Sequence, residues 1–309
     1  MQEDKMKFFI TGANGQLGRD LISELISRGF ECVASGRNLL ELKENFADLE
    51  NCEYIQLDIT DYNAVESALK KFMPDRIIHC AAWTAVDAAE DEENKNKVFA
   101  VNVTGTENIA RACKEINSIM TYISTDYVFD GTGSRAWTPE DENFAPLNFY
   151  GETKLKGERA VKKILEKFFI VRIAWVFGPH GNNFVKTMLK ISQTHDTLRV
   201  VNDQIGTPTY TPDLSRLLAD INLTEKFGIY HATNEGGYIS WYDFAREIFS
   251  QAGLNNIKVI PVSSFEYGAS KAKRPFNSRL DKSKLKISGF NLLPSWQDAL
   301  KRYLKIIRS

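Results

Sequence analysis

Hydrophobic residues recur in short runs along the first half of the chain, separated by segments whose apolar residues follow helical spacing. Residues 7–10 form an apolar run typical of a buried strand, and residues 20–29 place leucine and isoleucine on one face of a helix. The alternation then repeats, with strands predicted at 31–35, 53–57, 75–82, 118–124 and 168–178 and helices at 38–46, 61–72, 94–117 and 149–167. This rhythm predicts an α/β fold, a Rossmann-like doubly wound parallel sheet.

The rhythm weakens beyond Gly178, where longer loops separate the predicted elements. Helices are predicted at 184–192, 213–221, 240–253 and 294–307, and strands within 198–212, 229–233 and 257–262. We therefore expect residues 1–178 to form one domain and residues 179–309 to form a smaller lobe, with some segments interleaved between the two.

Composition excludes several classes of protein. The 309 residues are 43% hydrophobic and 26% charged with a formal net charge of −1, so no basic excess points to nucleic acid or a membrane surface. No apolar run approaches ~18 residues and the N-terminus has no signal-peptide pattern, so we expect a cytoplasmic protein. The 4 cysteines are scattered and the 4 histidines show no ligand spacing, which favours reduced thiols and no metal.

Three glycines lie between the first predicted strand and helix. Gly12 permits a tight turn, Gly15 lets a pyrophosphate approach the backbone, and Gly18 lets the helix pack closely on its strand. The helix N-terminus would offer N–H groups to phosphates. The turn therefore indicates a dinucleotide site, although an ordinary strand-to-helix turn is the alternative and the spacing differs from that of most dehydrogenases. The site is expected to include Asn14, Gln16 and Leu17.

The residues after the second predicted strand bear on the choice of cofactor. An acid about 20 residues beyond the glycines usually binds the ribose, but Ser35, Gly36 and Arg37 stand there. Arg37 could pair with a 2′-phosphate, which favours NADPH or indifference between NADPH and NADH; a surface arginine is the alternative. Asp58 is a candidate adenine-edge acceptor, or else a helix N-cap at Asp58 or Thr60. Further cofactor contacts are predicted at Ile59, Ala81, Ala82, Thr84 and Asn102.

Tyr150 and Lys154 are spaced to share one helix face. The spacing recurs at Tyr267 and Lys271, but only Tyr150 opens a helix that follows a predicted strand and its loop. That strand continues into Thr125, so a hydroxyl should meet the tyrosine at one sheet edge. A lysine ammonium favours phenolate and would lower the tyrosine pKa from ~10. We expect Thr125, Tyr150 and Lys154 to be catalytic, with Tyr150 and Lys154 also contacting the cofactor.

A series of motifs spans nearly the whole chain: TGANGQLG, AAWTAVDAAE, STDYVFDG, PLNFYGETKLKGE, RIAWVFG, GNNFVKTML, VNDQIGTPT and RPFNSRL. Together they resemble the dTDP-4-dehydrorhamnose reductase family of the extended short-chain dehydrogenase/reductase superfamily. The resemblance implies reduction of the 4-keto group of dTDP-4-dehydro-6-deoxy-L-mannose to dTDP-L-rhamnose, with NADP(H) or NAD(H). It implies a dTDP-sugar ligand for a monomer or homodimer, without nucleic acid or membrane partners.

The resemblance also implies substrate contacts, by position in the motifs. These fall at Thr84, Val86, Thr125, Asp126, Trp175, Asn183, Asp203, Gln204, Pro208 and Arg274. Arg274 would pair with the diphosphate, with a surface cation as the alternative. Core packing is the alternative for Val86 and Trp175. Some relatives bind Mg²⁺ through glutamates at a dimer interface, but the matching positions here are Asp20, Pro212 and Gln297, so we expect no equivalent metal site.

Three functions stay open at this stage. The reductase is the first. The second is a sugar-nucleotide 4,6-dehydratase or epimerase; a dehydratase typically carries Thr-Asp-Glu after the strand, whereas this chain has Tyr127 in the third position. The third is a non-catalytic NADP-binding subunit resembling the β subunit of methionine adenosyltransferase. A different product, such as a 6-deoxy-L-talose, also remains open, because one sequence does not show which face of C4 receives hydride.

Overall fold

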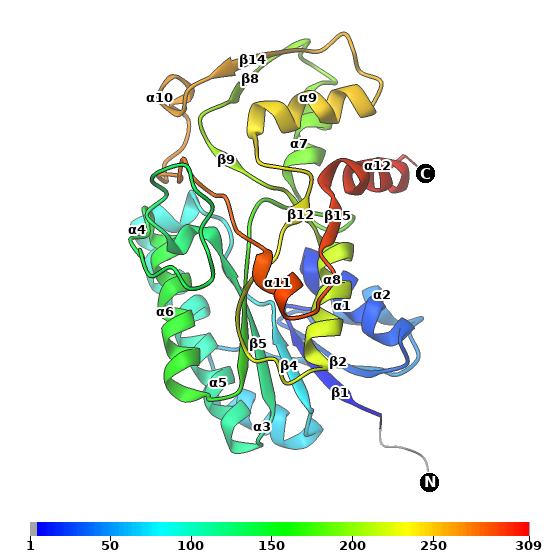
Figure 1. Cartoon of the computed structure of the whole chain (residues 1–309). Coiled ribbons are helices and arrows are strands. Elements are labelled where there is room, and N and C mark those ends of the chain that lie inside the picture. Colours follow the sequence, from blue (N-terminus) through cyan, green and yellow to red (C-terminus); the bar gives the residue numbers. More distant parts are fainter. Residues whose placement is uncertain (1–4, 309) are drawn as a thin grey trace.

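A seven-stranded parallel sheet organises the larger lobe of the computed structural model, which describes residues 5–308 (Figure 1). In the order β11-β6-β5-β4-β1-β2-β3, its strands are β1 (Lys7–Thr11), β2 (Glu31–Gly36), β3 (Cys52–Gln56), β4 (Arg76–His79), β5 (Ile119–Thr125), β6 (Phe168–Ile173) and β11 (Gly228–His231). The strand order reverses at β1, between β2 and β4, and open α/β sheets bind ligands beyond such a point. The predicted doubly wound α/β fold is confirmed.

Helices cover both faces of this sheet because neighbouring strand residues point to opposite sides. Phe8 belongs to the core beneath α1 (Gln16–Ser27), α2 (Leu39–Phe46) and α8 (Thr211–Asn222). Phe9 belongs to the core beneath α3 (Tyr62–Phe72), α5 (Gly105–Glu115) and α6 (Phe149–Ile164). The helix predicted at 94–117 is a helical run of three parts: α4 (Glu92–Phe99), the π-helical segment η2 (Ala100–Thr104) and α5.

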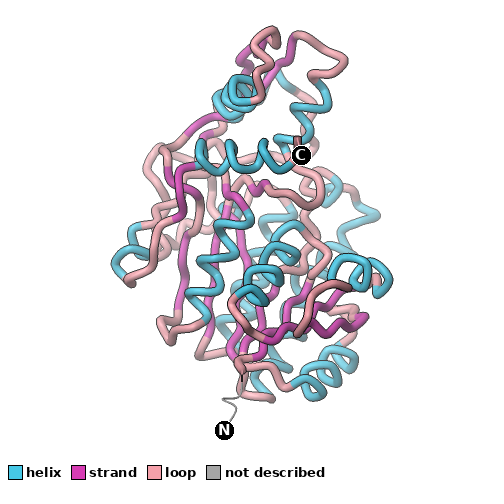
Figure 2. Tube along the Cα trace, turned by 90° about the vertical axis from the view of Figure 1, so that its right-hand side faces the viewer, coloured by secondary structure: helices cyan, strands magenta, loops and turns pink. Residues whose placement is uncertain are grey.

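The smaller lobe lies beyond the carboxyl ends of the strands (Figures 1 and 2). It is built from two-stranded sheets that pair β7 (Val176–Phe177) with β10 (Thr209–Tyr210), β8 (Thr197–Val201) with β14 (Lys258–Val262), β9 (Ile205–Gly206) with β13 (Ile239–Ser240), and β12 (Asn234–Glu235) with β15 (Leu293–Ser295). Its helices are α7 (Phe184–Ile191), α9 (Trp241–Gln251), α10 (Ser264–Tyr267) and α12 (Trp296–Ile306), whereas α11 (Ser283–Ile287) packs on β11 of the larger lobe. A separate hydrophobic core joins α7, α9 and α12.

The chain crosses between the lobes at Trp175. The single strand predicted at 168–178 is wrong, because Trp175 adopts a φ of 50° and this left-handed conformation interrupts the extended backbone. β6 therefore ends at Ile173 in the main sheet, and β7 pairs with β10 instead. Segments beyond Gly178 return to the larger lobe, since α8 packs on α1 and β11 pairs with β6.

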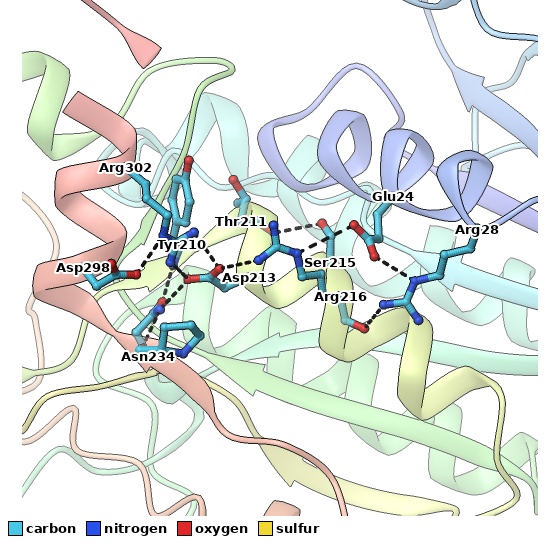
Figure 3. A network of polar contacts seen from close by, with 11 residues as sticks. Glu24, Arg28, Tyr210, Thr211, Asp213, Ser215, Arg216, Asn234, Asp298 and Arg302 are labelled. Atoms are coloured by element: carbon cyan, nitrogen blue, oxygen red, sulfur yellow. Dashed lines mark hydrogen bonds and ion pairs between the residues drawn. The ribbon is translucent and has the colours of Figure 1, made fainter. Parts of the chain in front are cut away.

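A buried carboxylate ties the C-terminal helix to the larger lobe (Figure 3). Asp213, in the first turn of α8, has a side chain with 0% exposure and accepts two hydrogen bonds from Arg302 of α12, at 2.9 and 2.7 Å. Asn234 donates to it at 2.9 Å, and Arg216 at 3.3 Å. Because a buried charge is costly without partners, this cluster fixes how α12 sits on α8.

Candidate active site

The glycine turn leaves no room for side chains at two of its positions. Gly12 has a φ of +66°, and a Cβ on it would lie 2.7 Å from the backbone of Ala81. A Cβ on Gly18 would lie 2.4 Å from the carbonyl oxygen of Gly12. Gly15 is the N-cap of α1 and supplies no side-chain cap, so the first amides of the helix can serve an anion. The turn therefore fits a pyrophosphate lying against its backbone.

Other predicted cofactor residues surround this turn. Asn14 donates to the carbonyl of Asn38, the N-cap of α2, at 3.4 Å, and Gln16 donates to the carbonyl of Asn182 at 3.0 Å. Arg37 is exposed directly after the end of β2. Leu17 is buried in the sheet core and acts in packing.

Asp58 is exposed and is held by its own loop. Its carboxylate accepts from the backbone N–H and hydroxyl of Thr60, at 2.9 and 2.8 Å. The alternative of an N-cap at Asp58 or Thr60 is wrong, because Asp61 caps α3. Ile59 is buried, and a Cβ on Gly105 would lie 2.6 Å from its side chain, so Ile59 packs against α5.

Asn102 shapes the turn that follows β4. Its Oδ1 accepts from the backbone N–H of Trp83 at 2.7 Å, and its Nδ2 donates to the Trp83 carbonyl at 3.2 Å and to Thr153 of α6 at 3.0 Å. Asn102 lies in the π-helical segment η2 and is 1% exposed. The residue expected to contact the cofactor is thus occupied in holding the segment that carries Ala81, Ala82 and Thr84.

Thr125 and Tyr150 meet at the carboxyl end of β5, as the sequence pattern predicted. The two hydroxyls are close enough for that of Thr125 to lower the pKa of the Tyr150 phenol. Thr125 Oγ1 also donates to Asp126 Oδ1 at 3.0 Å and accepts from the backbone N–H of Tyr127 at 3.2 Å. Tyr150 stands in the first turn of α6, which is capped by Asn148. Strand end and helix start therefore bring the two hydroxyls together.

Lys154 lies one turn further along α6 and is 3% exposed. Its ammonium donates to the carbonyl of Ile123 at 2.7 Å and lies 4.1 Å from the centroid of the Tyr122 ring. Burial lowers the pKa of Lys154 to about 7, against the influence of Glu158, which raises it. Even with Glu158 present, part of the ammonium population is therefore lost near neutral pH.

The expectation that Lys154 lowers the pKa of Tyr150 is wrong. Although part of Tyr150 is exposed, loss of hydration and the nearby Asp126 carboxylate raise the pKa of its phenol above the ordinary 10.0. The phenolate would lose hydration here, and among the described residues the charge that acts on it is that of Asp126 and not that of Lys154. Tyr150 is thus a neutral phenol at physiological pH, the form that donates a proton.

Asp126 is a buried carboxylic acid beside these hydroxyls. It is 2% exposed, and its Oδ2 has no hydrogen-bond partner among residues 5–308. Burial raises its pKa to about 6, opposed by hydrogen bonds from Ser278 and Thr125. The unpartnered oxygen is itself buried, so a sugar hydroxyl could reach it only after the surrounding side chains move.

Segments from both lobes bring further predicted substrate residues together. Arg274 donates to Asp87 at 3.1 and 2.6 Å and is a hydrogen-bond partner of Tyr127, whose ring meets that of Tyr150 with centroids 5.9 Å apart. Trp175 stacks on Trp241 at 3.7 Å. A cation thus lies beside the tyrosine pair, whereas Trp175 packs on Trp241. Thr84 and Val86 precede Asp87 in the loop between β4 and η1 (Ala88–Glu90).

Asn183 is engaged in structure away from that cluster. It caps α7 through the Lys186 N–H at 3.1 Å, and its Nδ2 donates to the carbonyl of Gly178 and the hydroxyl of Tyr303. A sugar contact would have to share these bonds. The sequence motif could not reveal this, because Tyr303 lies at the far end of the chain.

Asp203 and Gln204 are likewise occupied, by the helix α10. Asp203 accepts from the backbone N–H and hydroxyl of Ser264, at 2.8 and 2.6 Å, and Gln204 donates to the same hydroxyl at 2.9 Å. The carbonyl of Pro208 accepts from the backbone of Asn234. The three residues therefore order loops of the smaller lobe.

Some residues of this region escaped sequence reasoning. Asp87 holds Arg274, and Ser278 lowers the pKa of Asp126, across long sequence separations that no periodicity signals. Glu158 was also missed, although its position one helical turn beyond Lys154 could have placed it on the same face.

The positions compared with the Mg²⁺ site of some relatives lie near the buried Asp213 cluster. Asp20 is 3.4 Å from His180, Pro212 opens α8, and Gln297 lies in the first turn of α12. Within residues 5–308, no three metal-binding side chains are grouped as a metal would need. In the same described part of the chain, no helix is long and apolar enough to cross a membrane.

A glycine turn lies at the switch point of a doubly wound sheet. A threonine ends β5, and a tyrosine and a lysine follow on α6. Together these features define an enzyme of the short-chain dehydrogenase/reductase class. The chain belongs to the dTDP-4-dehydrorhamnose reductase family, since the family model described as the RmlD substrate binding domain matches residues 6–309.

Individual relatives agree with this. The chain is 40% identical over 307 residues to a dTDP-4-dehydrorhamnose reductase of Aggregatibacter actinomycetemcomitans, covering 96% of this chain and 97% of the relative. A dTDP-4-keto-6-deoxy-D-glucose reductase of Streptomyces niveus is 33% identical, with 98% of each chain covered. The crystal structure of dTDP-4-dehydrorhamnose reductase from Bacillus anthracis in complex with NADP has a TM-score of 0.86 at 38% identity, covering 99% of this chain and 100% of that one.

Proposed function

We propose that this protein reduces the 4-keto group of dTDP-4-dehydro-6-deoxy-L-mannose to give dTDP-L-rhamnose, with NADPH or NADH as the electron donor. The meeting of Thr125 and Tyr150 above Lys154 carries the proposal, within a chain similar to reductases of this name over nearly its full length. The turn and the lysine are neighbours, because Gly12 contacts Ala81 and the adjacent Cys80 interacts with the charge of Lys154.

The cofactor would lie across the switch point of the sheet. Gly12, Gly15 and Gly18 would hold its pyrophosphate at the N-terminus of α1, and Arg37 would pair with a 2′-phosphate. Bound there, the nicotinamide cofactor supplies the hydride. The larger lobe, including α8 and β11, would bind this cofactor, and the smaller lobe would bind the nucleotide-sugar.

The side chains at the end of β5 supply the remaining chemistry. The hydroxyl of Thr125 would hold the carbonyl oxygen of the sugar. Tyr150, a neutral phenol because its pKa is raised, would give its proton to that oxygen as hydride reaches the carbon. One hydride and one proton convert the ketone to an alcohol. Lys154 would stabilise the tyrosinate left behind and hold the nicotinamide ribose.

Substrate residues would divide between sugar and diphosphate. By their positions in the shared motifs, Asp126 and Trp175 would contact the sugar, and Arg274 would pair with the diphosphate. We propose that the enzyme works in the cytoplasm as a monomer or homodimer.

The dehydratase and epimerase alternatives require a base for the C5 proton. Where a dehydratase typically has glutamate, this chain has Tyr127, whose pKa burial raises further above its usual range. The test is turnover in D₂O with unlabelled NADPH and the already epimerised 4-keto substrate. We expect stoichiometric NADPH oxidation with no deuterium at C5 above the enzyme-free background. Deuterium at C5, or turnover without net oxidation of NADPH, would instead assign the protein to the dehydratases or epimerases.

A second candidate substrate is the D-configured sugar, since one relative carries the name dTDP-4-keto-6-deoxy-D-glucose reductase. A panel of 4-keto-6-deoxy nucleotide sugars, with each product sugar identified, separates these substrates and detects a 6-deoxy-L-talose product. Tight NADPH binding without turnover of any member would favour the non-catalytic subunit.

A further inference from the structure

A fully hydrogen-bonded ion pair lies beneath the catalytic helix. Glu158 of α6 is 1% exposed, and its Oε1 accepts from Ser124 Oγ at 2.5 Å and from Arg172 Nε at 2.8 Å. Its Oε2 accepts from Arg172 Nη2 at 2.7 Å, and the arginine side chain is 0% exposed. A buried ion pair is weak evidence of stability, because desolvation offsets its attraction. Its position therefore suggests another role.

Arg172 is fixed from its other side as well. Its Nη1 donates to His231 Nε2 at 3.3 Å, and His231 Nδ1 in turn donates to the carbonyl of Trp137 at 3.0 Å. Burial holds the pKa of His231 well below its ordinary value, so the ring is neutral and accepts from the arginine. The guanidinium also lies over the ring of Phe129, 4.9 Å from its centroid. Arg172 is thus set to hold Glu158 in one place.

Glu158 and Lys154 contact consecutive residues of β5. Lys154 donates to the carbonyl of Ile123, Glu158 accepts from Ser124, and Thr125 follows directly. Lys154 and Glu158 are four residues apart in one helix and so share a face. These two contacts fix the register of the catalytic helix against the strand that carries the catalytic threonine.

A glycine makes this close approach possible. A Cβ on Gly157 would lie 2.3 Å from the hydroxyl of Tyr122, which donates to the carbonyl of Lys154 at 3.3 Å. Helix and strand are therefore in direct contact along the turn between the lysine and the glutamate.

Few charges face the Lys154 ammonium. Tyr122 presents its ring, and burial raises its pKa far above the ordinary value, so it stays neutral. Burial raises the pKa of the Cys80 thiol to about 12 and lowers that of His79 to about 3, so both are neutral at pH 7. Among the described residues whose charge acts on Lys154, only Glu158 is then a full anion.

We propose that Glu158 is a positioning residue for catalysis: it locks α6 onto β5 and supplies the negative charge that faces Lys154, while Arg172 holds its carboxylate. The inference rests on the proposed function in taking Lys154 as catalytic. It assigns a purpose to an ion pair whose two side chains are buried.

The experiment compares the protonation of Lys154 across variants. Glu158→Gln keeps the size of the side chain and can accept from Ser124, but it leaves Arg172 unpaired. The double variant Glu158→Gln/Arg172→Met removes both charges, a replacement that proteins often tolerate. Glu158→Asp keeps the charge. Glu152→Gln is the matched control, because Glu152 lies on the same helix but pairs with Lys156 at an exposed position.

Two readouts are taken from each folded variant. Lysine-labelled protein gives the titration midpoint of Lys154 by NMR, assigned through its loss in Lys154→Met. The pH profile of NADPH oxidation with the 4-keto sugar gives the basic limb of kcat. We expect both to move down by about one pH unit or more in Glu158→Gln and the double variant, about a tenfold loss of activity on that limb. Glu158→Asp should restore most of the midpoint, and Glu152→Gln should match wild type.

An unchanged midpoint in folded Glu158→Gln or in the folded double variant would overturn the inference, as would equal shifts in Glu158→Asp and Glu158→Gln. If the charge-free variants fail to fold, Glu158→Asp decides alone: a wild-type midpoint with lowered kcat supports the inference, and a lowered midpoint contradicts it. Failure of wild type to turn over any 4-keto sugar would sink the proposed function, while the NMR midpoint still tests the role of Glu158.

Discussion

Asp87 holds Arg274 by two hydrogen bonds, at 3.1 and 2.6 Å, and accepts a third from the backbone N–H of Ala272. Asp87 follows β4 in the larger lobe, whereas Arg274 comes from the late segment after α10. The cation proposed to bind the substrate diphosphate is therefore already paired with a carboxylate. A diphosphate must share or replace that partner.

Arg274→Ala should raise the KM for the dTDP-sugar about 10- to 100-fold and change kcat little, because a charge-assisted bond contributes roughly 1.5–3 kcal/mol to binding. Asp87→Asn should lower the KM, since it removes the competing carboxylate. Steady-state kinetics measures both. Lys271→Ala is the control, because Lys271 makes an exposed pair with Asp91 nearby. An unchanged KM in Arg274→Ala would remove Arg274 from the binding site.

Tyr150→Phe should lower kcat by roughly 10²–10⁴, the usual range for loss of a general acid. Binding of NADPH and substrate should persist, because only one hydroxyl is lost. Tyr267→Phe is the matched control, since Tyr267 is 45% exposed in α10 and shares only the sequence spacing. Single-turnover kinetics and equilibrium binding separate the two effects. Similar losses in both variants would mean that the catalytic tyrosine is misassigned.

Arg37→Ala should raise the KM for NADPH about tenfold or more and leave that for NADH nearly unchanged. Only NADPH carries the 2′-phosphate that an exposed guanidinium after β2 can pair with. The wild-type enzyme should use both NADPH and NADH, because no carboxylate at the end of β2 repels the 2′-phosphate. If Arg37→Ala leaves the preference between NADPH and NADH unchanged, then Arg37 does not bind the 2′-phosphate.

Asp126→Asn should change how stability depends on pH. The folded pKa of Asp126 is raised from 3.8 to about 6, so the folded state holds this proton more tightly than the unfolded chain. The bound proton stabilises the folded state fully at a pH below the unfolded pKa. This stabilisation, up to about 3 kcal/mol, is lost as pH rises through the folded pKa. Urea unfolding at pH 4.5 and 7.5 measures it. The free energy of unfolding of Asp126→Asn, relative to that of wild type, should be higher at pH 7.5 than at pH 4.5. An equal difference between variant and wild type at the two pH values would contradict this.

Arg302→Met should lower the free energy of unfolding by about 3 kcal/mol, because it leaves the buried Asp213 with Asn234 and a partly exposed arginine. Lys305→Met, an exposed change on the same helix, is the control. Urea unfolding compares them. A loss no greater than that of Lys305→Met would show that the cluster in Figure 3 does not fix α12.

Local pattern was enough to predict most of the larger lobe. Strand β1, the glycine turn and α1 follow one another within 21 residues, and Tyr150 and Lys154 share a helix, so spacing alone relates their side chains. Thr125 ends β5 at the carboxyl edge of the sheet, and Tyr150 opens the helix that follows β5 and its loop. Their convergence could therefore be predicted from the order of these elements.

Contacts between distant segments could not be predicted in this way. The left-handed backbone of Trp175, the return of β11 to the main sheet, and the pairing of Asp87 with Arg274 over 187 positions depend on tertiary packing. The prediction of a lowered pKa for Tyr150 was wrong for a related reason, because the spacing of two residues in the sequence does not reveal burial. The bond from Asn183 to the hydroxyl of Tyr303 likewise needed the C-terminal helix in place.

The wide turn η2 also absorbs one residue in the middle of a helical run. A π-helical turn holds about one more residue than an α-helical turn, and each α-helical residue advances the direction of its side chain by about 100°. Deleting a single residue between Ala100 and Thr104 would therefore regularise the helix and leave the facing of α4 and α5 almost unchanged. The deletion would instead remove the bulge that carries Asn102 to the backbone of Trp83. A one-residue length difference here should therefore be counted as a substitution in the site, because the helices on either side keep their places.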